Sequence, residues 1–205
     1  MKTTTLTFLI FALLICMGCS TSKTIPSQWV SADFKNQKID RLLVYANTED
    51  TNLQVEFENK VALSLTKQGL SPLKMHVIFP EISYKENRTQ EEINQFALEC
   101  KNKNINKVLL ASRKSMIVDT VNTKSLHNYF NTLEPLKLGK TDVNSLVYDK
   151  KEIITYTLEA AVYDIGTTSE DKPIATSTLK AINPKSLDKL KEEFLDAIVL
   201  LFKNK

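Results

Sequence analysis

The chain has very few of the residues on which most catalytic and metal sites depend. Its 205 residues include four glycines, two histidines and three cysteines. This glycine content, with no glycine-rich loop, argues against nucleotide chemistry, and neither His76 nor His127 accompanies the G-x-S-x-G elbow of a serine hydrolase. Two histidines and few thiols are also too few soft ligands for a zinc or copper site. We therefore expect no cofactor and no metal.

An excess of charge of one sign is also missing. The chain has 27 lysines and arginines against 24 acidic residues, a net charge of +3. A surface this balanced does not create the positive field that attracts nucleic acid, so we expect no nucleic-acid partner. The mild excess of lysine suits a position near anionic lipid without requiring one.

The most informative feature that is present is the N-terminal segment. Lys2 gives it a positive start, and the apolar stretch 6–15 is shorter than the roughly 20 residues that a membrane-spanning helix needs. We therefore predict that residues 1–18 are an export signal peptide. Gly18 stands directly before Cys19, as in the lipobox of bacterial lipoproteins, where a peptidase fits a small residue beside the thiol that becomes acylated. An ordinary secreted protein and an uncleaved anchor remain alternatives.

Cys19 is the predicted lipidation site. Cys16 is the weaker candidate because bulky Ile15 precedes it. A processed Cys19 would carry three acyl chains on its amine and thiol, and two or more chains hold a protein stably on a membrane. Ser20 follows, not the aspartate that retains many lipoproteins in the inner membrane, and no acidic cluster lies in 20–24. These features predict an outer-membrane anchor with the protein facing the periplasm.

The remaining chain reads as a tether, residues 19–38, followed by a single domain, residues 39–205. Once Cys19 is acylated and the signal removed, Cys100 is the remaining thiol, on the predicted apolar face of a helix. An intramolecular disulfide is then impossible, so a hydrophobic core has to stabilise the domain. We expect the aromatic residues of the tether, Trp29 and Phe34, to dock on that domain.

The first half of the domain alternates strands with helices. Predicted strands cover 39–46, 73–77 and 107–112, and the last either ends there or runs on, bent, toward Val118. Predicted helices start at capping boxes of Thr51 with Gln54 and Thr89 with Glu92. Gly69 offers the first helix a left-handed stop. The order strand-helix-strand-helix-strand implies parallel pairing with helices covering the sheet.

The second half of the domain reads as antiparallel. Residues 154–162 alternate apolar with polar positions, 166–172 turn the chain, and 173–182 return as a hairpin partner. A last amphipathic helix starts at 183–184 and is expected to pack on the sheet. The predicted class is therefore α/β (α+β), with a mixed sheet, a β-hairpin and a C-terminal amphipathic helix.

A long polar stretch at about 119–151 separates the two halves. It contains the aromatic and apolar candidates for contact with a partner, His127, Tyr129, Phe130 and Tyr148. A loop of this length is either functional or poorly ordered, and its aromatic groups either fold back over the core or contact another protein.

Several short signatures occur in a familiar order along nearly all of the mature chain. They lie at Trp29, 42–48, 57–58, Gly69, 79–80, 108–110, 155–159, 162–164 and 183–184. In order and spacing they resemble a family of small lipoproteins of Gram-negative bacteria. The resemblance implies an architecture similar to the outer-membrane lipoprotein activators of penicillin-binding proteins and to the amino-terminal domain of the Tol translocation protein, which work by protein contact. Pro173-Ile174-Ala175 departs from the family pattern of an apolar residue and tryptophan, which puts a shared partner surface in doubt.

Three functional hypotheses follow. The first is a membrane-anchored lipoprotein whose non-catalytic periplasmic domain binds another envelope component through the 119–151 loop or an exposed sheet edge. The second is an envelope hydrolase with carboxylates that the sequence does not locate, since the helix glutamates read as solvated faces: Glu56, Glu58, Glu91, Glu92, Glu192 and Glu193. The third is a small-ligand carrier with a cavity on the order of several hundred Å³, lined by Leu109, Leu158 and Phe194.

Overall fold

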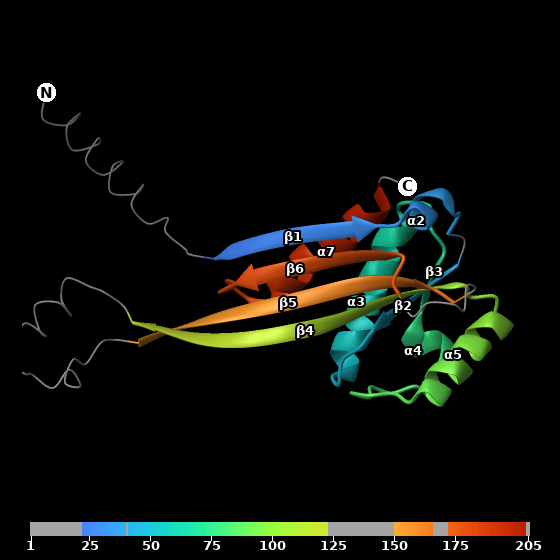
Figure 1. The fold of residues 1–205 in the computed structure, drawn as a ribbon, viewed down its shortest axis with the longest axis horizontal. Coiled ribbons are helices and arrows are strands. Elements are labelled where there is room, and N and C mark those ends of the chain that lie inside the picture. Colours follow the sequence, from blue (N-terminus) through green and yellow to red (C-terminus); the bar gives the residue numbers. More distant parts are fainter. Residues whose placement is uncertain (1–21, 40, 123–149, 166–171, 204–205) are drawn as a thin grey trace, which may run out of the picture.

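The computed structural model of the protein describes residues 22–39, 41–122, 150–165 and 172–203, which share a six-stranded sheet in the order β1-β6-β5-β4-β2-β3 (Figure 1). The strands are β1 (Lys23–Val30), β2 (Leu42–Ala46), β3 (Pro72–Lys74), β4 (Lys107–Asn122), β5 (Lys150–Asp164) and β6 (Ala175–Ile182). The helices are α2 (Ala32–Asn36), α3 (Thr51–Thr66), α4 (Met75–Ile78), α5 (Gln90–Asn102) and α7 (Leu187–Lys203). The mixed sheet and the C-terminal helix confirm the predicted fold class.

The parallel half of the sheet follows the predicted order. β2 pairs in parallel with β3 on one side and with β4 on the other. All five residues of β2 are buried, as expected for a strand covered on both faces. α3 and α5 provide the two crossovers.

The ends of the first helices agree with the sequence in part. Thr89 and Glu92 form the predicted capping box of α5, and Gly69 takes the left-handed conformation after α3, with φ at +84°. The predicted box at Thr51 is wrong. Asp50 caps α3 instead, because its carboxylate accepts hydrogen bonds from the backbone N–H groups of residues 52 and 53 at 2.9 and 3.0 Å.

The predicted strand at 73–77 is shorter than expected. The strand ends at Lys74, and the chain turns at once into the short helix α4. The backbone N–H of His76 donates to the buried carboxylate of Glu58 at 3.0 Å, and that of Phe79 donates to the carbonyl of Met75 at 2.9 Å. A tertiary hydrogen bond therefore ends the strand where the local sequence alone favours its continuation.

The antiparallel half contains a long hairpin arm made by β4 and β5. β4 runs past Val118 to Asn122, with a register shift between Arg113 and Ser115, and its last residue pairs with Lys150. The predicted loop at 119–151 is therefore too long at both ends, because 119–122 and 150–151 are paired strand residues. The candidate contact residues of that loop lie outside the described residues: His127, Tyr129, Phe130 and Tyr148.

The predicted tether is wrong in its second part. Residues 23–30 form β1, which pairs antiparallel with β6 along its whole length and so belongs to the sheet. Pro26 argues against a strand in the sequence, but an edge strand tolerates it. Phe34 docks as predicted, with 2% of its surface exposed and its ring 5.6 Å from that of Phe202, whereas Trp29 does not dock and remains 53% exposed.

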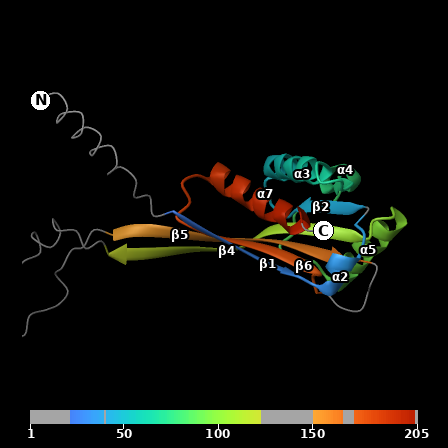
Figure 2. The same cartoon turned by 90° about the horizontal axis from the view of Figure 1, so that it is seen from above.

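The helices cover the two faces of the sheet unequally. α3 and α7 lie together over one face, while α5 lies on the other face near the β2 end (Figure 2). Phe57 of α3 stacks on Phe194 of α7 with ring centroids 5.6 Å apart, and both rings belong to the larger core cluster. α7 packs on the sheet as predicted. It starts after Ser186, whose hydroxyl accepts from the N–H of Lys189, rather than at 183–184.

Candidate interaction surface

The face of β1 that points away from α7 carries two exposed apolar side chains. Thr24 donates from Oγ1 to Glu193 at 2.6 Å, and Gln28 donates from Nε2 to the carbonyl of Ala197 at 2.8 Å, so these two residues face α7. Because side chains alternate along a strand, Ile25 and Trp29 point to the opposite face. They are 41% and 53% exposed. Among the described residues, no helix lies over this face of β1 and β6 (Figure 2).

A polar strip borders these residues on the neighbouring strands. Thr178 of β6 lies beside Glu159 of β5 in the sheet register. Lys114 stands at the register shift of β4 and donates from Nζ to Glu159 at 2.9 Å, and that hydrogen bond raises the pKa of Lys114. The uncovered face therefore combines an aromatic group, an aliphatic group, hydroxyls and a charge pair, a mixture typical of protein-binding surfaces.

The outer edge of β1 is poorly suited to pairing with a strand of another protein. β1 is an edge strand of the sheet, so its outer edge has no strand neighbour among the described residues. Pro26 lies in the middle of the strand and has no N–H to donate, and proline is a common feature of edges that do not pair with other chains. We therefore take the uncovered face as the candidate interaction surface.

A buried carboxylate, Glu58 of α3, forms a polar cluster away from this surface. Glu58 is 0% exposed. One oxygen, Oε1, accepts from the backbone N–H of Ala46 at 3.1 Å and from Nε2 of Gln54 at 3.0 Å. The other, Oε2, accepts from the backbone N–H of His76 at 3.0 Å and lies 2.6 Å from Nδ1 of the same residue. The carboxylate thus joins the end of β2 to α3 and to the start of α4.

Reading Glu58 as part of a solvated helix face is therefore wrong. Its helical neighbour Glu56 fits that reading, since its side chain is 45% exposed. Glu58 lies instead on the buried side of α3, one turn after the buried Gln54, and no local sequence signal separates it from Glu56. Both oxygens of Glu58 are engaged by hydrogen-bond partners, as in a carboxylate that fixes the fold.

A buried ion pair closes the core end of the hairpin made by β4 and β5. Nζ of Lys107, the first residue of β4, lies 2.7 Å from the carboxylate of Asp164, the last residue of β5. Their side chains are 5% and 7% exposed. The pair joins two residues that are direct neighbours in the antiparallel register, so it fastens the strands where the hairpin enters the core.

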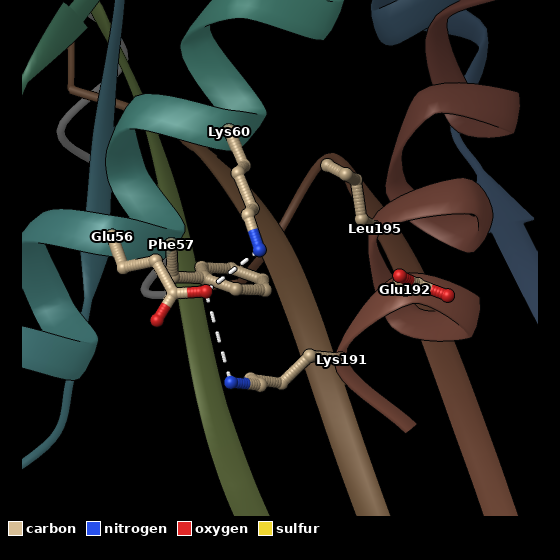
Figure 3. Close-up of a pocket in the computed structure, with 6 residues that line it drawn as sticks. All are labelled: Glu56, Phe57, Lys60, Lys191, Glu192 and Leu195. Atoms are coloured by element: carbon tan, nitrogen blue, oxygen red, sulfur yellow. Dashed lines mark hydrogen bonds and ion pairs between the residues drawn. The ribbon is translucent and has the colours of Figure 1, made fainter. Parts of the chain in front are cut away.

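A shallow depression lies between α3 and α7 (Figure 3). Its lining residues are Glu56, Phe57, Lys60, Lys191, Glu192 and Leu195, and it encloses about 10 Å³, which is room for roughly one water molecule. The hydrogen bond from Lys60 at 2.6 Å and the charge of Lys191 at 3.7 Å lower the pKa of Glu56. None of the three residues expected around a carrier cavity lines it, and two of them, Leu109 and Phe194, are buried in the core.

The thiol of Cys100 is buried in the core. Cys100 is 0% exposed, and its burial raises the pKa of the thiol to about 12. Within 22–39, 41–122, 150–165 and 172–203, no group of three or more His, Cys, Asp or Glu residues is placed to hold a metal ion. No helix in these ranges is both long and apolar enough to cross a bilayer. Cys19 precedes the described residues.

Comparison with known proteins gives matches at the level of structure. No protein-family model and no curated protein matches the chain. A PelC dodecamer from Paraburkholderia phytofirmans is similar with a TM-score of 0.43 and 10% sequence identity, over 89% of this chain and 96% of that chain. The lipoprotein GNA1162 from Neisseria meningitidis is similar with a TM-score of 0.40 and 13% identity, over 81% of this chain and 99% of that chain. The resemblance to activators of penicillin-binding proteins and to the Tol domain stays a prediction.

Proposed function

We propose that this chain is a lipid-anchored protein of the bacterial cell envelope that acts by binding another envelope protein rather than by catalysis. In this proposal acylated Cys19 holds it in the outer membrane, and the folded part faces the periplasm. The lipobox-like sequence at Gly18 and Cys19 supports the anchor. The observation that carries the binding role is the uncovered face of the sheet, with Trp29 and Ile25 exposed on it.

The structure supports a short connection between anchor and fold. β1 starts at Lys23, four residues after Cys19. Four residues of chain span at most about 14 Å, so an acylated Cys19 would keep the sheet close to the lipid. A partner of such a protein is expected to be another component of the same membrane or of the adjoining periplasm.

Trp29 is the side chain on which the binding proposal depends most. Tryptophan is enriched among the residues that contribute most to protein interfaces, because it buries a large area at a small cost in side-chain entropy. An indole with 53% of its surface exposed, beside Ile25 and the polar strip, is poorly explained by the packing of this chain alone. A partner that covers this face would bury both apolar groups.

The test is position-specific photo-crosslinking in living cells of a Gram-negative host that carries the protein naturally. A photoreactive amino acid is placed at Trp29 in one variant and at Leu63 in the control. Leu63 is an exposed apolar residue of α3, on the other side of the sheet, with 59% exposure. We expect one protein to be captured from position 29 and not from position 63.

Two further results bear on the same proposal. Capture from position 29 should fall in a Cys19→Ala variant, since that chain is not held at the membrane. Equal capture from positions 29 and 63, or capture from neither, would refute the binding surface. Turnover of a peptidoglycan or lipid substrate by the purified protein would refute the non-catalytic role.

A further inference from the structure

The far end of the hairpin arm has apolar side chains exposed on both of its faces. β4 and β5 extend beyond the helices (Figure 1), and past the pair of Ile117 with Thr155 they form a two-stranded ribbon. Four apolar residues near the end of β4 are exposed: Met116 (46%), Ile117 (50%), Val118 (48%) and Val121 (38%). Polar residues alternate with these apolar groups on each face, Asp119 and Lys151 beside Val121 and Thr120 and Glu152 beside Val118. Four exposed apolar side chains between residues 116 and 121 are still more than the end of a sheet in water usually carries, and a nonpolar environment would explain them.

The register of the sheet assigns these residues to the two faces. Met116 pairs with Tyr156, which packs against the core under α7, so Met116 and Val118 point to the α7 side. Ile117 and Val121 point to the opposite side, the one that carries Trp29 further along the sheet. Contact with a flat partner would use one of these faces, whereas insertion into a nonpolar layer uses both.

The same register places this end of the arm beside the start of β1. Ile117 pairs with Thr155, Thr155 with Ile182, and Ile182 with Lys23. Three strand spacings of about 4.8 Å amount to roughly 14 Å across the sheet. Val121 lies four residues beyond Ile117 along β4, and Cys19 lies four residues before Lys23. The chain between Cys19 and Lys23 is therefore long enough for the anchor to lie level with the end of the arm.

The charge around this end of the arm is close to balanced. Lys23, Lys150 and Lys151 stand against Asp119 and Glu152. Attraction to anionic headgroups is therefore weak, and the apolar groups have to supply the contact. Contact of this kind does not depend on anionic lipid.

We propose that the end of the arm, with Ile117 and Val121 at its centre, enters the interface of the lipid bilayer that holds Cys19. The proposal rests on the lipid anchor of the proposed function, and it adds an orientation. β1 and the arm point their Lys23 and Val121 ends at the membrane, and Trp29 stands away from it. Six residues of strand separate Trp29 from Lys23, which is about 20 Å.

The single native tryptophan makes the orientation measurable. The lipidated full chain is purified from a Gram-negative host and reconstituted into neutral phosphatidylcholine vesicles with brominated acyl chains, which quench indole fluorescence on contact. One sample is the parent protein, whose indole is Trp29. The second carries Trp29→Phe with Ile117→Trp, and the third carries Trp29→Phe with Val121→Trp, in case one substitution prevents folding.

We expect about a twofold or greater loss of fluorescence in both substituted proteins, since interfacial groups reach roughly 5–10 Å into the headgroup and acyl boundary. The parent protein should lose almost none. Unquenched indoles at 117 and 121 in anchored protein would overturn the proposal. A blue shift without quenching that depends on protein concentration would overturn it in favour of a second copy of this chain as the occupant.

A separate arm of the experiment distinguishes failure of the anchor from failure of the orientation. If the host does not acylate the chain, the mature protein is coupled through Cys19 to a maleimide lipid. Cys100 does not compete, because it is buried and the pKa of its thiol is about 12. Quenching in the coupled protein would then support the orientation while the anchor of the proposed function fails, and its absence would refute the orientation itself.

Discussion

Replacing Glu58 with glutamine removes an acceptor from the centre of a buried hydrogen-bond cluster while leaving the size of the side chain unchanged. The carboxylate lies within hydrogen-bond distance of four nitrogens, two at each oxygen. A carboxamide has one oxygen, and its NH₂ group is a donor. Whichever way the amide is placed, donors then face donors at one end.

The side-chain partners can adjust to this change but the backbone partners cannot. Gln54 can flip its amide, and the ring of His76 can shift its proton to the other nitrogen, so each becomes an acceptor. The backbone N–H groups of Ala46 and His76 have no such freedom, and one of them loses its acceptor in either orientation. An unsatisfied buried backbone donor costs about 1–3 kcal/mol, and we expect the Glu58→Gln variant to lose that much stability.

Glu56→Gln is the matched control, on the same helix. Glu56 is exposed and pairs with lysines at the surface, so its replacement should leave the stability almost unchanged. The assay is urea unfolding of both variants and the parent, followed by circular dichroism, with the slope of the transition checked for constancy. Equal midpoints for Glu58→Gln and Glu56→Gln would refute the assignment of Glu58 as a structural clamp.

Three further predictions concern other residues of the described fold. Cys100 should react with a thiol reagent at pH 8 roughly three orders of magnitude more slowly than an ordinary thiol. Its pKa of about 12, against a usual 9.0, lowers the fraction of reactive thiolate by that factor, and unfolding should restore the rate. As the pH rises, the thiol ionises in the unfolded chain near pH 9, before it ionises in the folded chain near pH 12. The free energy of unfolding should therefore be unaffected by this thiol below pH 9 and should fall between pH 9 and 12, which urea unfolding across that range would detect. Gly69→Ala should cost about 1 kcal/mol in the same assay, since an added Cβ meets no atom within 4 Å and the positive φ alone is unfavourable; no loss would contradict this. Lys107→Met should cost about 3 kcal/mol by removing the charge that lies 2.7 Å from the buried carboxylate of Asp164, and a loss below about 1 kcal/mol would show that the pair is dispensable.

The sequence predicted those elements that depend on local pattern. β2 and the first part of β4 are apolar runs of strand length, α5 has its capping box, and α7 has a continuous apolar stripe. Each of these signals lies within about seventeen consecutive residues, so the chain around it does not change the interpretation. Their order also sufficed for the parallel pairing, because the crossover rule depends on sequence order alone.

The elements that were missed depend on distant partners. β1 contains Pro26 and little alternation, and it becomes a strand because it pairs with β6 about 150 residues later. Glu58 has the sequence context of a solvated helix residue, and the end of β2 and the start of α4 bury it. Hydrogen bonds of this kind cannot be predicted from the spacing of residues within one helix.

The candidate interaction surface was missed for a related reason. The exposure of Trp29 follows from where the helices lie, since α3 and α7 both cover the same face of the sheet. The even spacing of Ile25 and Trp29 would put them on one face of a strand, but the local sequence does not mark this segment as a strand. Whether that face is covered depends on the packing of the whole chain.

The central claim is that Cys19 is acylated and anchors the protein, and metabolic labelling tests it most directly. Cells of a Gram-negative host that express the parent protein, Cys19→Ala or Cys16→Ala are grown with an alkyne-bearing palmitate analogue, and the purified protein is examined for label and for the mass of its N-terminal peptide. We expect label in the parent and in Cys16→Ala, with an N-terminus at residue 19, and none in Cys19→Ala. Label that survives in Cys19→Ala, or a parent protein without label, would contradict the account.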